Sequence, residues 1–130
     1  MTEPMEFRAA LVELSSALRV VHQRLLMAVQ RNFEKLHGRV GGPGELLQLA
    51  VNDPLFAWLA PLTAQIATID ERTRDEVDAA AVAAVRAEVL ALLEDESDFR
   101  ASYLVYLQAE PDVVVAHATL RRLVAAGHAL

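Results

Sequence analysis

The segment from residue 4 to residue 37 is the longest periodic stretch of the chain and has no glycine or proline after Pro4. Its apolar residues recur at alternating spacings of four and three, which places them on one face of an α-helix: Phe7, Leu11, Leu14, Leu18, Val21, Leu25 and Ala28. The stretch therefore predicts one helix about 50 Å long. A flanking row adds further apolar surface: Val12, Val29, Phe33 and Leu36.

Composition favours the same fold class. Of the 130 residues, 54% are hydrophobic and only 5% are aromatic, and alanine makes up much of the hydrophobic fraction. This balance suits closely packed helices better than sheets with large cross-strand pairs. We therefore expect an all-α fold in which residues 1–130 form a single helical-bundle domain.

Glycines, prolines and acidic clusters divide the rest of the chain into shorter helical segments. A flexible Gly-rich loop over residues 38–44 follows the long helix, and further helices are expected over 45–51, 54–71, 79–94, 98–110 and 113–126. Asp75 or Asp78 is expected to cap one of these helices, and Ser97 or Asp98 the next. The sequence predicts five to six helices and no strand.

The central segment 54–71 carries the most local information. Asp53 followed by Pro54 is a strong helix start, because the carboxylate accepts free N–H groups and proline has none to lose. Pro61 interrupts the helix that follows. It predicts either a kink or a break between Leu59 and Leu62. Since the apolar row continues in phase across it, we favour a Pro-kinked central helix, with a groove beside Trp58 where carbonyls near Ala57 are freed.

Several functional classes are excluded or disfavoured. The chain has no cysteine, which rules out disulfides, thiolate metal sites and cysteine nucleophiles. No apolar run approaches the roughly 20 residues that cross a bilayer, and Glu3 and Glu6 stand where a secretory signal would be basic. We expect a cytoplasmic protein without a membrane partner.

The net charge of −6 is distributed unevenly. Residues 1–52 carry six Lys/Arg and five Asp/Glu, whereas residues 53–112 carry four and thirteen. A binder of the phosphate backbone needs several basic residues on one face. The acidic middle therefore argues against a nucleic-acid partner, although a regulator using the basic faces of the first and last helices stays an alternative.

Two histidines carry the most specific chemical hypothesis. His22 and His117 each fall mid-helix near an apolar face, and with an interior carboxylate such as Asp70 or Glu88 they could ligate a metal or form an acid–base pair. The alternative is that each imidazole is half-buried and hydrogen-bonded for structural reasons. The serines and adjacent acidic pairs lie at helix ends or lack triad spacing, so no catalytic residue is assigned.

Protein–protein contact is the function we expect. Arg24, Arg31 and Lys35 share one face of the long helix, whereas residues 75–98 are acidic, so these surfaces could meet within a chain or across a dimer. Two apolar rows on the long helix exceed what short helices easily cover, and a two-fold homodimer would cover the excess. The alternative is a monomer in which the helices over 45–51 and 98–110 cover the second row. Trp58 and Pro61 would mark a contact groove.

Four stretches resemble a family of small uncharacterised bacterial helical proteins: GPGELLQL, DPLFAWLAPL, IDE and PDVVVAHATLRRL. The resemblance covers most of the chain and implies no activity, ligand or cofactor. We expect a non-enzymatic homodimeric accessory or regulatory protein without a cofactor. The alternative is a helical bundle that binds a metal or small ligand through interior histidine and carboxylate side chains.

Overall fold

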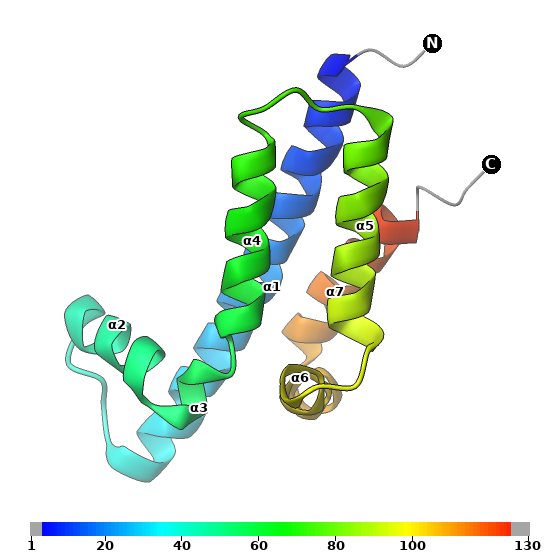
Figure 1. The fold of residues 1–130 in the computed structure, drawn as a ribbon. Helices are drawn as coiled ribbons and strands as arrows, with labels where there is room; N and C mark the ends of the chain where they lie inside the picture. Colours follow the sequence, from blue (N-terminus) through cyan, green and yellow to red (C-terminus); the bar gives the residue numbers. More distant parts are fainter. Residues whose placement is uncertain (1–3, 126–130) are drawn as a thin grey trace.

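The computed structural model describes residues 4–125, which form seven α-helices and no strand (Figure 1). All-α architecture is therefore confirmed. The helices in chain order are α1 (Pro4–His37), α2 (Pro43–Asn52), α3 (Pro54–Ala57), α4 (Ala60–Arg72), α5 (Ala79–Glu94), α6 (Asp98–Ala109) and α7 (Pro111–Ala125).

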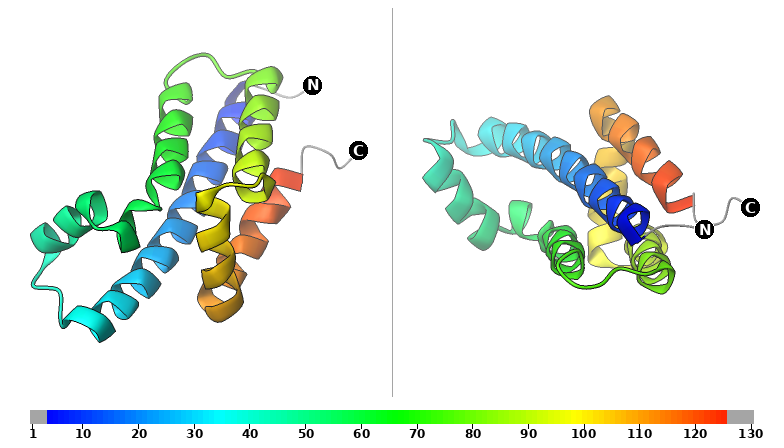
Figure 2. Two further views of the ribbon diagram at one scale, coloured as in Figure 1. Left: turned by 60° about the horizontal axis from the view of Figure 1, so that its bottom comes forward. Right: turned by 90° about the horizontal axis from the view of Figure 1, so that it is seen from above.

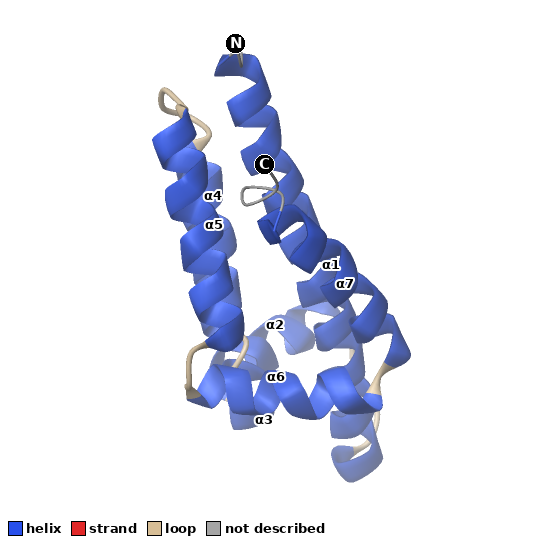
Figure 3. Cartoon of the chain, turned by 90° about the vertical axis from the view of Figure 1, so that its right-hand side faces the viewer, coloured by secondary structure: helices blue, strands red, loops and turns tan. Residues whose placement is uncertain are grey.

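The long helix α1 is the spine of the molecule. Helices α4 and α5 form an antiparallel pair along one side of it, and α7 packs on the other, as the view from above shows (Figure 2). Helix α6 crosses one end and connects α5 to α7 (Figure 3). Helices α2 and α3 lie beside the C-terminal part of α1, and α2 packs mainly on α3.

The four-three row of α1 forms the centre of the core. From Leu11 to Ala28 every member of that row is buried, and Phe7 is half-buried. The row meets buried side chains from four helices: Leu62, Ile66 and Ile69 of α4, Val82, Val85 and Val89 of α5, Phe99 and Tyr103 of α6, and Val113, Leu120 and Val124 of α7. Burial of this one face explains why the chain folds around α1.

The flanking row of α1 is covered only in part. Val29 and Phe33 are buried against Phe56 of α3 in a second cluster, to which α2 contributes Leu46 and Leu49. Two other members of the row, Val12 and Leu36, are 50% and 70% exposed. Helices α2 and α3 thus cover the middle of the row within one chain, and its two ends stay exposed.

Helix ends follow the predicted signals. The backbone of Gly38 takes a positive φ of 89°, and its N–H bonds to the carbonyl of Glu34 at 2.9 Å, which ends α1. Asp53 caps α3 by accepting from the N–H of Leu55. Of the paired alternatives, Asp78 caps α5 by accepting from the N–H of Ala81 at 2.8 Å, and Ser97 caps α6.

The prediction of a kink at Pro61 is wrong, because the helix breaks there. Trp58 and Leu59 form a turn between α3 and α4, and Pro61 falls in the first turn of α4. The N–H groups in the first turn of a helix have no carbonyl of the same helix to bond to, so proline is tolerated there. In a continuous helix, the ring of Pro61 would collide with the carbonyl of Ala57. Beginning a new helix avoids that collision.

Other boundaries differ slightly from those predicted. The break at Pro61 raises the number of helices in residues 4–125 to seven, above the five to six expected. Helix α2 begins at Pro43 and α7 at Pro111, since proline starts both helices at no hydrogen-bonding cost. The predicted end of the last helix at Ala126 and Gly127 lies outside the described residues.

The cap of α5 provides a test of this fold. Replacement Asp78→Ala removes the acceptor of the Ala81 N–H, so we expect the free energy of unfolding to fall by about 1 kcal/mol in urea denaturation. Asp75→Ala is the matched control, because the side chain of Asp75 caps no helix, and the bonds of Asp75 to Arg8 at 2.6 Å and to Arg72 at 3.2 Å use its backbone atoms. An equal loss in both variants would contradict the assignment of the cap.

Candidate functional site

An apolar groove of about 780 Å³ lies between α1, α2, α3 and α4. One wall is α2, which contributes Leu46, Leu47, Ala50 and Val51. The facing side is α4, which contributes Ala60, Thr63, Ala64 and Ala67. Leu26 of α1, Phe56 of α3 and Leu59 lie between the two sides. The lining contains no carboxylate, guanidinium or ammonium group.

The α2 wall is exposed because this helix buries no residue completely. Its inner side chains Leu46 and Leu49 are half-buried against Phe56, whereas Leu47 and Val51 are 67% and 69% exposed. Leu47 and Val51 are four residues apart and so project from the same side of the helix. They form an apolar ridge with no cover within the described chain.

The α4 side of the groove is flat. Ala60, Ala64 and Ala67 are exposed and follow the four-three spacing of one helical face. Their methyl side chains allow another chain or ligand to approach the backbone of α4 closely. The ridge on α2 and the alanine row on α4 thus give the groove one protruding and one recessed side.

His22 and Thr63 are the polar side chains of the groove. The Nε2 atom of His22 lies 3.3 Å from the Thr63 hydroxyl. Burial, followed by the nearby charge of Arg19, lowers the pKa of His22 below its ordinary value of 6.5. The imidazole is therefore uncharged at neutral pH, and the groove presents one hydrogen-bonding point in an apolar surface.

Trp58 faces away from this groove. Its ring stacks on that of Tyr106 at 5.5 Å and 10°, and lies 5.6 Å from the ring of Phe99. The indole thereby fixes the α3–α4 turn against α6. Pro61 is exposed, and neither residue is among those that line the groove, although Ala57 is. The groove thus lies next to the broken helix, but Trp58 and Pro61, the residues expected to mark it, are not part of its lining.

The three basic residues expected on one face of α1 have separate surroundings. Arg24 lines a depression of about 340 Å³ between α1 and α7, together with Asp112. Arg31 forms an ion pair with Glu110 at 2.8 Å, and Lys35 is exposed. In the described chain, the ion pairs of the acidic region run instead to α4 and α7, through Arg72–Glu88 and Arg121–Glu94, each at 2.8 Å.

The metal candidates are not brought together. His22 pairs with Thr63 of α4, whereas the Nδ1 atom of His117 lies 2.7 Å from the hydroxyl of Tyr103 in α6. Asp70 pairs with α1, and Glu88 accepts from Arg72 and from Gln65. Across residues 4–125, no three His, Asp or Glu side chains gather closely enough to hold a metal ion. Each candidate instead links two helices.

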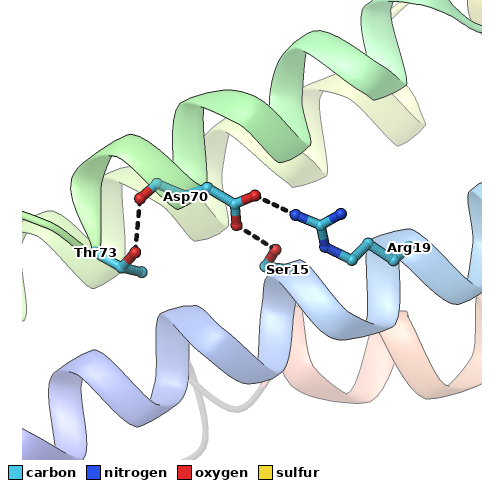
Figure 4. Close-up of polar contacts among 4 residues, drawn as sticks. All are labelled: Ser15, Arg19, Asp70 and Thr73. Carbon is cyan, nitrogen blue, oxygen red and sulfur yellow. Dashed lines mark hydrogen bonds and ion pairs between the residues drawn. The ribbon is translucent and has the colours of Figure 1, made fainter.

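Asp70 is the centre of the polar contacts between α1 and α4 (Figure 4). Its carboxylate accepts from the hydroxyl of Ser15 at 2.7 Å and from the guanidinium of Arg19. Its carbonyl accepts from the hydroxyl of Thr73 at 2.6 Å. Ser15 is 5% exposed and needs this acceptor. With no histidine in the cluster to take the serine proton, the arrangement is a helix clamp and not a nucleophile.

Sequence reasoning missed the residues that shape the groove. The four-three spacing of Ala60, Ala64 and Ala67 was a usable signal, because a regular row of alanines on an amphipathic helix marks a surface open to close approach. The adjacent pair Leu46 and Leu47 was another, since neighbouring residues point about 100° apart and one short helix cannot bury both against one surface.

No family model, curated protein or solved structure matches the chain. None of the helices within residues 4–125 has the length and hydrophobicity needed to cross a membrane. The geometry of the groove and of the polar clusters is therefore the basis for the function proposed below.

The Asp70 clamp predicts a stability defect. In Asp70→Ala the buried hydroxyl of Ser15 loses its acceptor, so we expect the free energy of unfolding to fall by about 1 to 3 kcal/mol in chemical denaturation. Glu71→Ala, at an exposed neighbouring position, is the control and should change stability by less than about 0.5 kcal/mol. Adding Ser15→Ala to Asp70→Ala should restore part of the loss; a further loss would contradict the clamp.

His117 predicts a pH dependence of stability. Burial, and then the charge of Arg121, lowers its pKa below 6.5 in the folded state, so the unfolded chain binds the proton more readily. Stability is therefore complete above about pH 6.5 and decreases as the pH falls toward the folded-state pKa, and His22 contributes in the same direction. Urea denaturation between neutral and mildly acidic pH should show a smaller decrease for His117→Gln than for the wild type. His37→Gln, at an exposed position, is the control and should behave as the wild type.

Proposed function

We propose that the protein is a non-enzymatic accessory or regulatory protein that acts through protein–protein contact, and that the groove between α2 and α4 is its contact surface. The occupant we propose is a second copy of the chain, in a two-fold homodimer. The observation that carries the proposal is the exposed ridge of Leu47 and Val51 beside the exposed alanine row of α4.

The shape of the groove supports self-association. In a two-fold contact both copies use the same surface, so that surface must be complementary to itself. It therefore needs both a protruding part and a recessed part that accepts it. The ridge of Leu47 and Val51 protrudes, and the row of Ala60, Ala64 and Ala67 is recessed. If the ridge of each copy packs on the row of the other, both apolar surfaces are removed from water together.

The electrostatics of the groove support the same proposal. No charged side chain lines it, and His22 is neutral at neutral pH, so closing the groove does not bury an ion. The net charge of −6 disfavours association at long range, and salt weakens this repulsion. Association through this face is therefore driven by apolar burial.

A small apolar ligand is the second candidate occupant. A volume of about 780 Å³ is within the range of small-molecule sites, and the His22–Thr63 pair offers the single polar anchor that such sites usually have. This alternative uses His22 as a hydrogen-bonding residue and needs no metal. It predicts a monomer whose groove is filled by the ligand instead of by another chain.

Light scattering after size-exclusion chromatography tests the proposed contact. We expect a dimer for the wild type, and an association at least roughly a hundredfold weaker for Ala64→Arg, because the new charge would be buried without a partner. Ala84→Arg is the matched control: Ala84 is an exposed alanine of α5 outside the groove, and this variant should remain a dimer.

Three outcomes would contradict the dimer through this groove. If the wild type were a monomer at high concentration, the proposed self-association would be excluded. If that monomer also bound an apolar dye saturably and Ala64→Arg abolished the binding, the ligand alternative would be favoured. A dimer that survived Ala64→Arg but was lost in Val20→Arg would move the contact to the surface between α1 and α7, where Val20 is 42% exposed.

A further inference from the structure

A second depression, of about 350 Å³, lies between the end of α5 and helices α6 and α7. Unlike the groove, it is lined by charged and polar side chains: Arg100 and Tyr103 of α6, His117 and Arg121 of α7, and Glu94 of α5. It shares no lining residue with the groove between α2 and α4. Its chemistry is therefore independent of the proposed dimer contact.

Arg100 has no anionic partner in the described structure. Its Nε atom is buried and makes no hydrogen bond, and no carboxylate of residues 4–125 lies within ion-pair distance of its guanidinium. The preceding loop is acidic, with Asp95, Glu96 and Asp98 close in sequence. A buried guanidinium N–H normally has an acceptor, and the Nε–H of Arg100 has none among residues 4–125.

The neighbouring side chains add donors to the same depression. Arg121 uses Nη1 to pair with Glu94 at 2.8 Å, and its guanidinium has further N–H groups. Burial raises the pKa of the Tyr103 hydroxyl well above its usual value of 10.0, so this group keeps its proton. It can donate that proton to Nδ1 of His117 at 2.7 Å, and in this tautomer Nε2 of His117 carries a proton.

The charges and the apolar lining together define a ligand class. Two guanidinium groups against one carboxylate leave the depression with one excess positive charge, which suits a monoanion. Leu93, Leu104 and Leu107 also line the depression and provide an apolar surface beside the donors. A carboxylate fits the planar fork of an arginine, and an attached apolar body would cover the leucines.

We propose that this depression binds a small organic carboxylate, with the carboxylate group on Arg100 beside Arg121 and His117 and its apolar body on the three leucines. Since the site is open and the ligand small, binding is in the millimolar range for a minimal probe. The bound carboxylate gives the guanidinium of Arg100 the anionic partner that it lacks within residues 4–125.

Titration of the full chain with benzoate, followed by the NMR signals of Tyr103 and His117, tests the proposal. We expect saturable shifts with benzoate at constant ionic strength, and weaker shifts with inorganic phosphate, which has no apolar body. Arg100→Gln should weaken benzoate binding roughly tenfold to a hundredfold, the contribution of a hydrogen-bonded charge pair. Arg100→Lys should also weaken it, because lysine keeps the charge but not the planar fork.

The chain provides a matched control in Arg86. Its Nε atom is likewise buried without a partner in the described residues, but Arg86 lies on α5 away from the lining of this depression. Arg86→Gln changes the net charge as Arg100→Gln does and should bind benzoate as the wild type does. Absence of saturable shifts, equal binding by Arg100→Gln, or equal loss in Arg86→Gln would each overturn the proposal. Phosphate binding as tight as benzoate binding would overturn the assigned ligand class.

Discussion

The burial of one continuous face of α1 is the interaction on which the rest of the structure depends. Four helices, α4, α5, α6 and α7, bring their apolar rows to it or to the side chains that cover it. A buried leucine contributes several kcal/mol, as the cost of about 2 to 5 kcal/mol for a leucine-to-alanine change in a core indicates. Leu11, Leu14, Leu18 and Leu25 are each buried almost completely. Because that face runs without interruption, helices far apart in the sequence share one core, and the polar clamp of Asp70 then fixes α4 against α1.

Helix α2 is the helix that does not bring a buried row to this face of α1, and the groove lies beside it for that reason. With ten residues it is too short to be stable in isolation, so its helical state depends on the contacts of Leu46 and Leu49 with Phe33 and Phe56. Those contacts use only one side of the helix. The remaining apolar side chains have no surface within the described chain to pack on, and a compact domain that leaves such a ridge beside a row of alanines resembles one half of an interface.

The sequence predicted those features that depend on residues close along the chain. The bounds of α1, the ends at Gly38 and Asp53, and the buried rows follow from spacing and capping, which act over a few residues. At Pro61 the kink was wrongly favoured over the break, because the in-phase apolar row is compatible with both a kinked helix and two helices. The groove and the pairing of His117 with Tyr103 depend on which helix faces meet in the folded chain, and the spacing of residues along the sequence does not specify this. Ala83, Ala84 and Ala87 of α5 are exposed, so they stabilise the helix without filling the core.

The two candidate sites differ in how they treat charge. The four ion pairs of the described chain are partly exposed, so each contributes at most about 1 kcal/mol and serves mainly to orient neighbouring helices. None lines the groove, whose apolar surface gains from being closed by another apolar surface. The depression at α6 contains Arg100, which has no anionic partner within residues 4–125. The partners proposed for them differ accordingly: the apolar surface of a second chain for the groove, and a small organic anion for the depression.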